Sequence, residues 1–245
     1  MTPADAAPES SDVPFWTYQD LIIFLGLALP CLLAGTMLVR GVMMVMGWST
    51  PHRALELLPG QFAGYAILFA ALGVLFRVQY QRSLWRAMRL VRSPIPWITI
   101  VSLGFVLAIC IAVLGALLHT PDGPNPMKDL LSDRTSLIFV SVAGSTLGPW
   151  FEEMAFRGLM QPLFIRSLGA APGILLAGLG FGLLHLPQYG LSWRHALLIT
   201  LAGASFGWMR HRTGSTAAST VMHSAYNLTL FLGFLASGKD VPKSW

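Results

Sequence analysis

Long runs of apolar residues recur along the chain, and most polar residues fall in short stretches between them. A helix that crosses a bilayer needs about 20 mostly apolar residues. We therefore predict an all-α fold, a polytopic transmembrane helical bundle of about seven spanning helices, with six to eight as the range. The predicted spans are residues 20–46, 60–80, 96–118, 135–165, 171–187, 193–211 and 216–237.

Prolines, glycines and polar stretches mark where these runs bend or end. Pro30 is expected to kink the first span and the Gly148-Pro149 pair to break or re-aim the fourth, because proline lacks a backbone donor and clashes with the preceding turn. Residues 119–134 are polar and rich in proline and glycine, so we predict the one sizeable loop outside the membrane there.

The chain is predicted to form one transmembrane domain between two short tails. Residues 1–19 are acidic and rich in Pro, Ala and Ser, and we expect a short disordered tail there. The transmembrane domain is predicted over residues 20–237, and residues 238–245 form a C-terminal tail.

Composition supports a membrane protein. Hydrophobic residues make up 54% of the chain and charged residues 11%, with a mean hydropathy of +0.62. Soluble domains average roughly 25% charged residues, and disorder requires low hydrophobicity, so both classes are excluded. The net charge of +5 forms no basic stripe of the DNA-binding kind, so membrane lipid is an expected partner and nucleic acid is not.

The densest positive cluster lies between the second and third predicted spans. Its members are Arg77, Arg82, Arg86, Arg89 and Arg92. By the positive-inside rule this loop is cytoplasmic. In a helical conformation the arginines would gather on one side, which suits an element in the headgroup layer.

Three charged residues stand inside the fourth apolar run, in GPWFEEMAFRGLM. Uncompensated, Glu152, Glu153 and Arg157 would cost about 8–10 kcal/mol at the bilayer centre. Glu153 and Arg157 are four positions apart and share a helical face, whereas Glu152 projects about 100° away. The spacing therefore predicts one carboxylate paired with a cation and one that needs another partner.

Two later spans supply candidate partners. Phe181 and His185 are four positions apart in one span, and His223 and Asn227 are four positions apart in the last. Each spacing directs a pair toward a common place. A carboxylate and a histidine can activate a water, and a histidine with an amide can donate hydrogen bonds to an oxyanion. This set is sufficient for peptide-bond hydrolysis.

These motifs, in this order, resemble those of the CPBP family of intramembrane endopeptidases, which includes CAAX proteases and bacteriocin-processing enzymes. The resemblance covers about residues 135–237, the expected catalytic core, without departure in the three motifs. It implies Glu152 as general base holding water with His185, and His223 with Asn227 as the oxyanion site. It further implies that Glu153 and Arg157, with Phe181, support this set.

The resemblance leaves the metal requirement open. No metal or other cofactor is favoured, since the chain lacks the H-E-x-x-H motif. Zinc is the alternative, because Glu152, His185 and His223 would be an adequate ligand set, and the family has often been described as metallopeptidases. The expected substrate is a protein or peptide, including lipid-modified or membrane-anchored ones, and the expected location is the bacterial inner membrane, with several passes.

Other interpretations of the buried charged residues and of the function of the chain stay open. The buried charges could be an interhelical polar staple, and the chain could be a non-catalytic family member that acts as a binding or immunity protein. The intact set of four candidate catalytic residues argues against the latter. A proton-coupled transporter would use the charges as a relay, but it predicts symmetry-related broken helices, which the sequence does not show.

Overall fold

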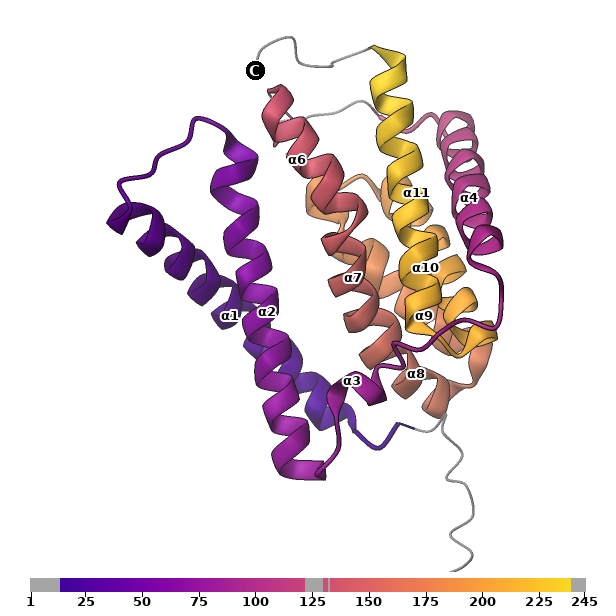
Figure 1. Cartoon of the computed structure of the whole chain (residues 1–245). Coiled ribbons are helices and arrows are strands. Elements are labelled where there is room, and N and C mark those ends of the chain that lie inside the picture. The colour runs from indigo at the N-terminus through magenta and orange to yellow at the C-terminus, as the bar shows by residue number, and fades with distance from the viewer. Residues whose placement is uncertain (1–13, 122–129, 132, 239–245) are drawn as a thin grey trace, which may run out of the picture.

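The computed structural model describes residues 14–121, 130–131 and 133–238, and most of both predicted tails falls outside these ranges. The described residues form helices and no strand, which confirms the all-α class (Figure 1). In chain order the elements are α1 (Tyr18–Val45), α2 (Arg53–Tyr80), α3 (Leu84–Ala87), α4 (Trp97–Leu117), α6 (Arg134–Ser145), α7 (Leu147–Glu153), the π-helix η1 (Met154–Met160), α8 (Gln161–Leu168), α9 (Ala170–Leu184), the 3₁₀-helix η2 (Leu186–Tyr189), α10 (Trp193–Thr213) and α11 (Thr216–Ser237).

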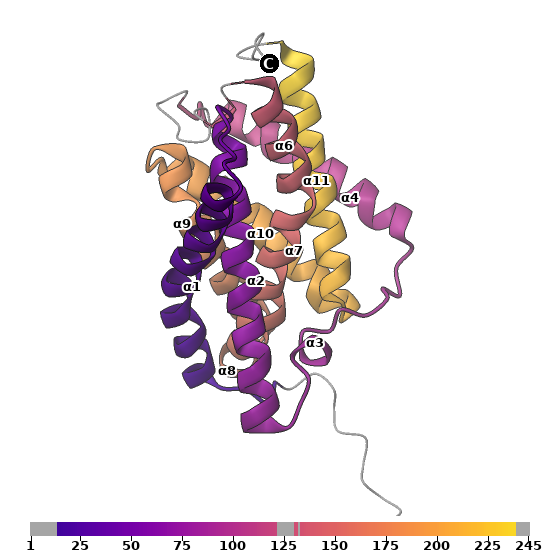
Figure 2. The same ribbon diagram turned by 60° about the vertical axis from the view of Figure 1, so that its left-hand side comes forward.

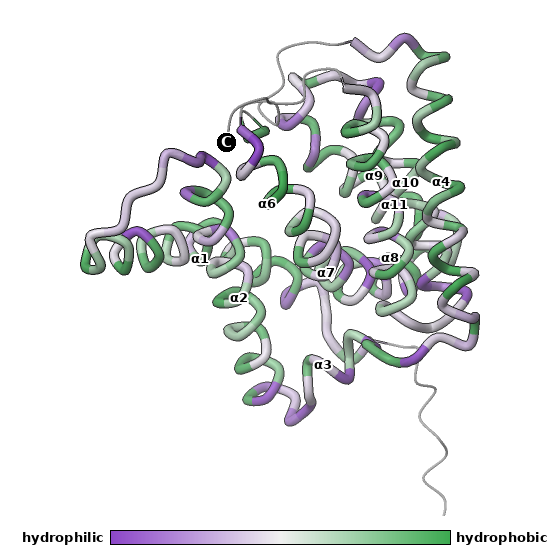
Figure 3. Tube along the Cα trace, turned by 45° about the horizontal axis from the view of Figure 1, so that its top comes forward, coloured by the Kyte–Doolittle hydropathy of each residue, from purple (hydrophilic) through white to green (hydrophobic). Residues whose placement is uncertain are grey.

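Several helices present apolar faces that no other described helix covers. Among the described helices α1, α2 and α4 are long and apolar enough to cross a membrane, and α9 is a shorter apolar helix. Large side chains such as Ile22, Ile98 and Leu175 point outward from α1, α4 and α9, and Figure 3 shows hydrophobic stretches along α1 and α4. Soluble monomers rarely expose such contiguous apolar surface, so the molecule is a membrane protein.

The helices pack mainly as neighbouring pairs. α1 pairs with α2 at one side of the molecule, α9 pairs with α10, and α4 pairs with α11. Figures 1 and 2 show α6 and α7 between the α1/α2 pair and α11. A Cβ atom on Gly35 would overlap the backbone N of Gly64 and lie 2.6 Å from the Gly60 carbonyl oxygen. The missing side chain at Gly35 therefore allows α1 and α2 to cross closely.

The fourth predicted span is divided into four elements. The chain breaks at Thr146 (φ −128°, ψ −77°), just before the predicted Gly148-Pro149 position. Pro149 lies in the first turn of α7, where a missing backbone N–H breaks no helical hydrogen bond. The π-helix η1 follows directly after Glu153 and carries Arg157. Both irregularities flank the candidate glutamates. π-Helical turns often occur at functional sites.

Arg77 of the arginine cluster lies in the last turn of α2, and the rest of the cluster is in a segment with the four-residue helix α3 and no long amphipathic helix. Leu84 and Met88 are buried, and Arg89 has a positive φ of 51° that ends the helical course. The Arg89 side chain donates to the Gly214 carbonyl (2.8 Å), and its own carbonyl accepts from the Thr216 N–H (3.0 Å). These backbone contacts with the start of α11 replace helical hydrogen bonds in the segment.

Candidate active site

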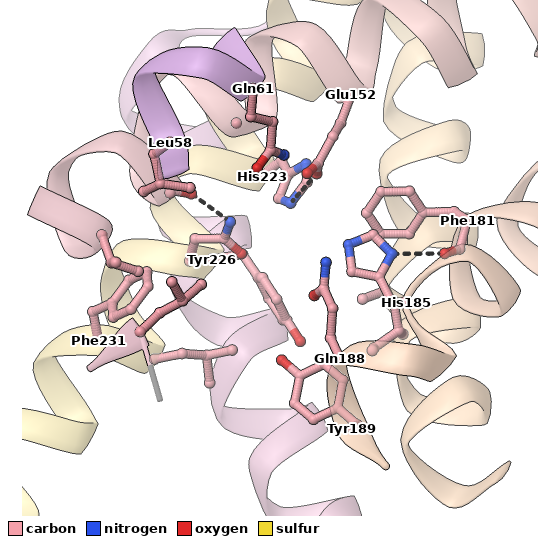
Figure 4. A pocket seen from close by; sticks show the side chains of 18 of the residues that line it. Leu58, Gln61, Glu152, Phe181, His185, Gln188, Tyr189, His223, Tyr226 and Phe231 are labelled. Carbon is pink, nitrogen blue, oxygen red and sulfur yellow. Dashed lines mark hydrogen bonds and ion pairs between the residues drawn. The ribbon is translucent and has the colours of Figure 1, made fainter. Parts of the chain in front are cut away.

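One cavity of about 420 Å³ brings the predicted motifs together (Figure 4). Glu152, Phe181, His185, His223 and Asn227 all line it. They come from three segments: α7, the end of α9 and α11. The cavity also has walls from α2, α6, η2 and α10.

Glu152 is the partly exposed member of the acidic pair. Its side chain is 28% exposed, whereas that of Glu153 is fully buried, as the difference in helical direction requires. The Oε2 atom of Glu152 lies 3.7 Å from Nε2 of His223. This separation exceeds a direct hydrogen bond, so both atoms stay available to a small molecule in the cavity.

Glu153 and Arg157 form a fully buried ion pair. Arg157 donates from Nη1 to Oε1 of Glu153 (2.8 Å) and from Nη2 to the Gly203 carbonyl on α10 (2.6 Å). The guanidinium also lies 4.7 Å from the ring centroid of Phe181. A buried charge is tolerated when it is paired and hydrogen-bonded, so this pair joins η1 to α9 and α10.

His223 has a fixed orientation between the two carboxylates. Its Nδ1 atom lies 3.0 Å from Oε1 of Glu153, and the Phe206 ring stacks on the imidazole at 4.4 Å. Because an ionised carboxylate only accepts hydrogen bonds, Nδ1 must carry the proton. The remaining nitrogen, Nε2, therefore faces Glu152.

His185 caps the C-terminal end of α9 rather than lying within the helix. The helix ends at Leu184, three residues before the predicted limit, with Pro187 just beyond. The His185 Nδ1 atom lies 2.7 Å from the Phe181 carbonyl, which can only accept, so Nδ1–H donates and Nε2 is unprotonated in the neutral ring. Within the described residues, no hydrogen bond joins His185 to Glu152.

Asn227 connects the last helix to the end of α6. Its Nδ2 atom donates to the Gly144 carbonyl at 2.7 Å. This bond uses one of the two amide hydrogens. The Asn227 side chain lines the cavity, which brings its second amide hydrogen and its amide oxygen there.

Several polar residues of the cavity were not predicted from the sequence. They are Gln61 and Tyr65 on α2, Gln188 and Tyr189 on η2, and Tyr226 on α11. None is one of the positions that define the three motifs, although Tyr226 lies between His223 and Asn227, and α2 is far from the motifs along the chain. Only the pattern of polar residues within an apolar run offered a signal, and it is common in membrane helices.

The expectation that the protein needs no metal stays a prediction. Within the described ranges, no three His, Cys, Asp or Glu side chains are close enough together to share one metal ion. The proposed ligands Glu152, His185 and His223 line the same cavity without converging on one point. We therefore derive no step through a metal.

These features define a class of protein: a helical membrane protein in which a carboxylate, two imidazoles and an amide share one internal cavity. Residues 134–229 match the family model of the Rce1-like type II CAAX prenyl endopeptidases. This segment of the chain is therefore similar to a family of membrane proteases, which confirms the resemblance predicted from the motifs. No curated protein and no solved structure matched the chain in the same comparisons.

Proposed function

We propose that the protein is an intramembrane endopeptidase of the bacterial inner membrane, with several membrane passes, that cleaves membrane-anchored proteins or peptides. One observation carries the proposal: Glu152, His185, His223 and Asn227 line a single cavity inside the family-matched segment. Carboxylate, imidazole and amide groups in such an arrangement can activate water and stabilise an oxyanion.

The attacking water would lie between Glu152 and His185. Glu152 would act as general base and take the proton that the water loses on attack. The neutral His185 ring, with its Nδ1–H held by the Phe181 carbonyl, offers Nε2 as a second acceptor for the same water. Two acceptors would orient the oxygen lone pair of the water toward the scissile carbonyl.

The carbonyl oxygen would face His223 and Asn227. The second amide hydrogen of Asn227 would donate to the developing oxyanion. His223 would also donate from Nε2 in its doubly protonated form, in which Nδ1–H stays bound to Glu153. Collapse of the tetrahedral intermediate breaks the C–N bond, and the proton held by Glu152 passes to the leaving nitrogen. Glu153 would keep His223 in the orientation that this role requires.

The proposed substrate class is supported by the family model and by the apolar part of the cavity lining. The family model describes prenyl endopeptidases of CAAX sequences, and part of the cavity is apolar. Leu58, Leu230, Phe231 and Phe234 belong to this apolar lining. We propose a substrate that presents apolar side chains or a lipid group beside the scissile bond.

The direct test is Glu152→Gln, which keeps the shape of the side chain and removes the base. With a fluorogenic peptide that ends in a prenylated CAAX sequence, we expect cleavage by the purified variant to fall at least 100-fold, with an unchanged melting temperature. The matched control is Glu56→Gln, because Glu56 lies at the surface in an exposed pair with Arg40. Substantial cleavage by Glu152→Gln would refute the proposed mechanism.

A further inference from the structure

Two amide side chains of the cavity have no part in the proposed chemistry. Gln61 on α2 and Gln188 on η2 line the cavity together with the candidate catalytic residues. They come from elements that are distant in the sequence and form different walls. Gln61 also lies outside the family-matched range 134–229. Its position in the cavity is therefore known from the structure and not from the family match.

Gln61 presents an acceptor to the cavity. Its Nε2 atom donates to the Tyr65 hydroxyl one turn later on α2, at 2.8 Å. This bond fixes the amide, and no hydrogen bond to another described residue occupies its Oε1 atom. Oε1 is therefore open to a donor that enters the cavity.

Gln188 presents a free amide from a rigid turn. Its backbone N–H donates to the His185 carbonyl at 3.0 Å, Pro187 lies in the first turn of η2, and Gly190 ends the turn with a φ of +61°. Its side-chain amide makes no hydrogen bond to any described residue. In Figure 4 this amide points toward the middle of the cavity.

A peptide that enters this cavity needs partners for its backbone. Unpaired N–H and C=O groups in an apolar, water-poor setting cost several kcal/mol each. An extended peptide directs these groups to both sides, and Gln61 and Gln188 lie on different walls. The catalytic groups are engaged with the water and the scissile carbonyl, so neighbouring peptide groups need other partners.

We infer that Gln61 and Gln188 are substrate-positioning residues that hydrogen-bond the peptide backbone on either side of the scissile bond. This inference rests on the proposed endopeptidase function. It assigns a role in substrate binding to α2, outside the matched domain. Because the two glutamine amides would pair with the peptide backbone, they would fix the register of the bound peptide largely independently of its side chains.

The test replaces each glutamine by methionine, which has similar length and no strong hydrogen-bonding group. With the fluorogenic prenylated CAAX peptide, we expect KM to rise about three- to tenfold for Gln61→Met and for Gln188→Met, with kcat within about twofold. The matched control is Gln79→Met, because Gln79 donates to the Tyr80 hydroxyl on the same helix but outside the cavity lining. Melting temperatures of all three variants verify folding.

An ester-containing peptide separates positioning from a merely structural role. An ester in place of a peptide bond beside the scissile bond removes one backbone N–H. We expect this change to weaken binding to the protein with Gln61 and to have little further effect on Gln61→Met. Equal losses for the amide and the ester peptides in both proteins, or unchanged KM values, would overturn the inference.

A binding assay distinguishes this inference from the proposed function. The Glu152→Gln protein in detergent is titrated with the labelled prenylated CAAX peptide, alone and combined with Gln61→Met or Gln188→Met, with empty micelles as background. Weaker binding in the combined variants supports the inference even when the protein with Glu152 shows no cleavage, a result that refutes only the proposed function. Equal binding in all variants, or no binding by Glu152→Gln, overturns the inference.

Discussion

Adjacent glutamates have different environments in this protein, and the difference starts from helix geometry. Glu153 is fully buried and accepts hydrogen bonds from Arg157 and His223, whereas Glu152 faces the cavity. The pairing with Arg157 could be predicted from the four-residue spacing. The bond to His223 could not, because it depends on how α11 packs against α7.

At the residue scale, Arg157→Ala should lower stability strongly. The change leaves the Glu153 carboxylate buried without its cation, which typically costs about 3–5 kcal/mol. The thermal unfolding midpoint in detergent should fall markedly, and activity should fall with it. Arg40→Ala is the control, because its pair with Glu56 is exposed and worth at most about 1 kcal/mol.

The combined variant Arg157→Ala/Glu153→Gln tests the cause of that loss. Removal of the stranded charge should recover part of the lost stability, since a neutral amide costs less to bury than an ion. A normal unfolding midpoint for Arg157→Ala alone would contradict the bracing role of the pair.

At the element scale, hydrophobic runs located some helices closely, but the predicted span 60–80 begins seven residues after the start of α2 at Arg53. The predicted span 216–237 coincides with α11, and 96–118 differs from α4 by one residue at each end. The run 135–165 is interrupted at Thr146, two residues before the Gly148-Pro149 pair where the sequence predicts a break. The π-helix η1 that follows α7 could not be predicted, because apolar character does not report backbone geometry.

The close crossing of α1 and α2 gives a prediction at this scale. Gly35→Ala should force the two helices apart, because the added Cβ would overlap the backbone of Gly64. We expect a loss of about 1–3 kcal/mol, as for other overpacked sites. Gly26→Ala on the same helix is the matched control, since no atom lies within 4 Å of its added Cβ. Equal unfolding midpoints for both variants would contradict the observed crossing.

At the scale of the whole molecule, the motifs predicted the part of the cavity lining that holds the candidate catalytic residues. Glu152, His185, His223 and Asn227 lie in motifs with helical spacing, so the sequence indicated that they would meet. The opposite wall from α2, with Gln61 and Tyr65, carries no motif. Its position depends on contacts between distant helices, which one sequence does not reveal.

The side-chain arrangement also predicts how the proposed cleavage responds to metal removal. Since no three donor side chains converge on one point within the described residues, cleavage of the prenylated CAAX peptide should persist within about twofold after strong chelation. A zinc-dependent peptidase treated in parallel verifies the chelation. Loss of cleavage that added zinc restores would favour the zinc alternative.

We propose above all that Glu152 is the general base for proteolysis inside the membrane. The most direct measurement compares terminal peptides in membranes that contain either the protein with Glu152 or the Glu152→Gln variant at equal abundance. We predict a set of new peptide termini, near membrane-anchored segments, that occurs only with the intact glutamate. Identical terminal peptides in both membranes, or the same new termini with the variant, would contradict the claim.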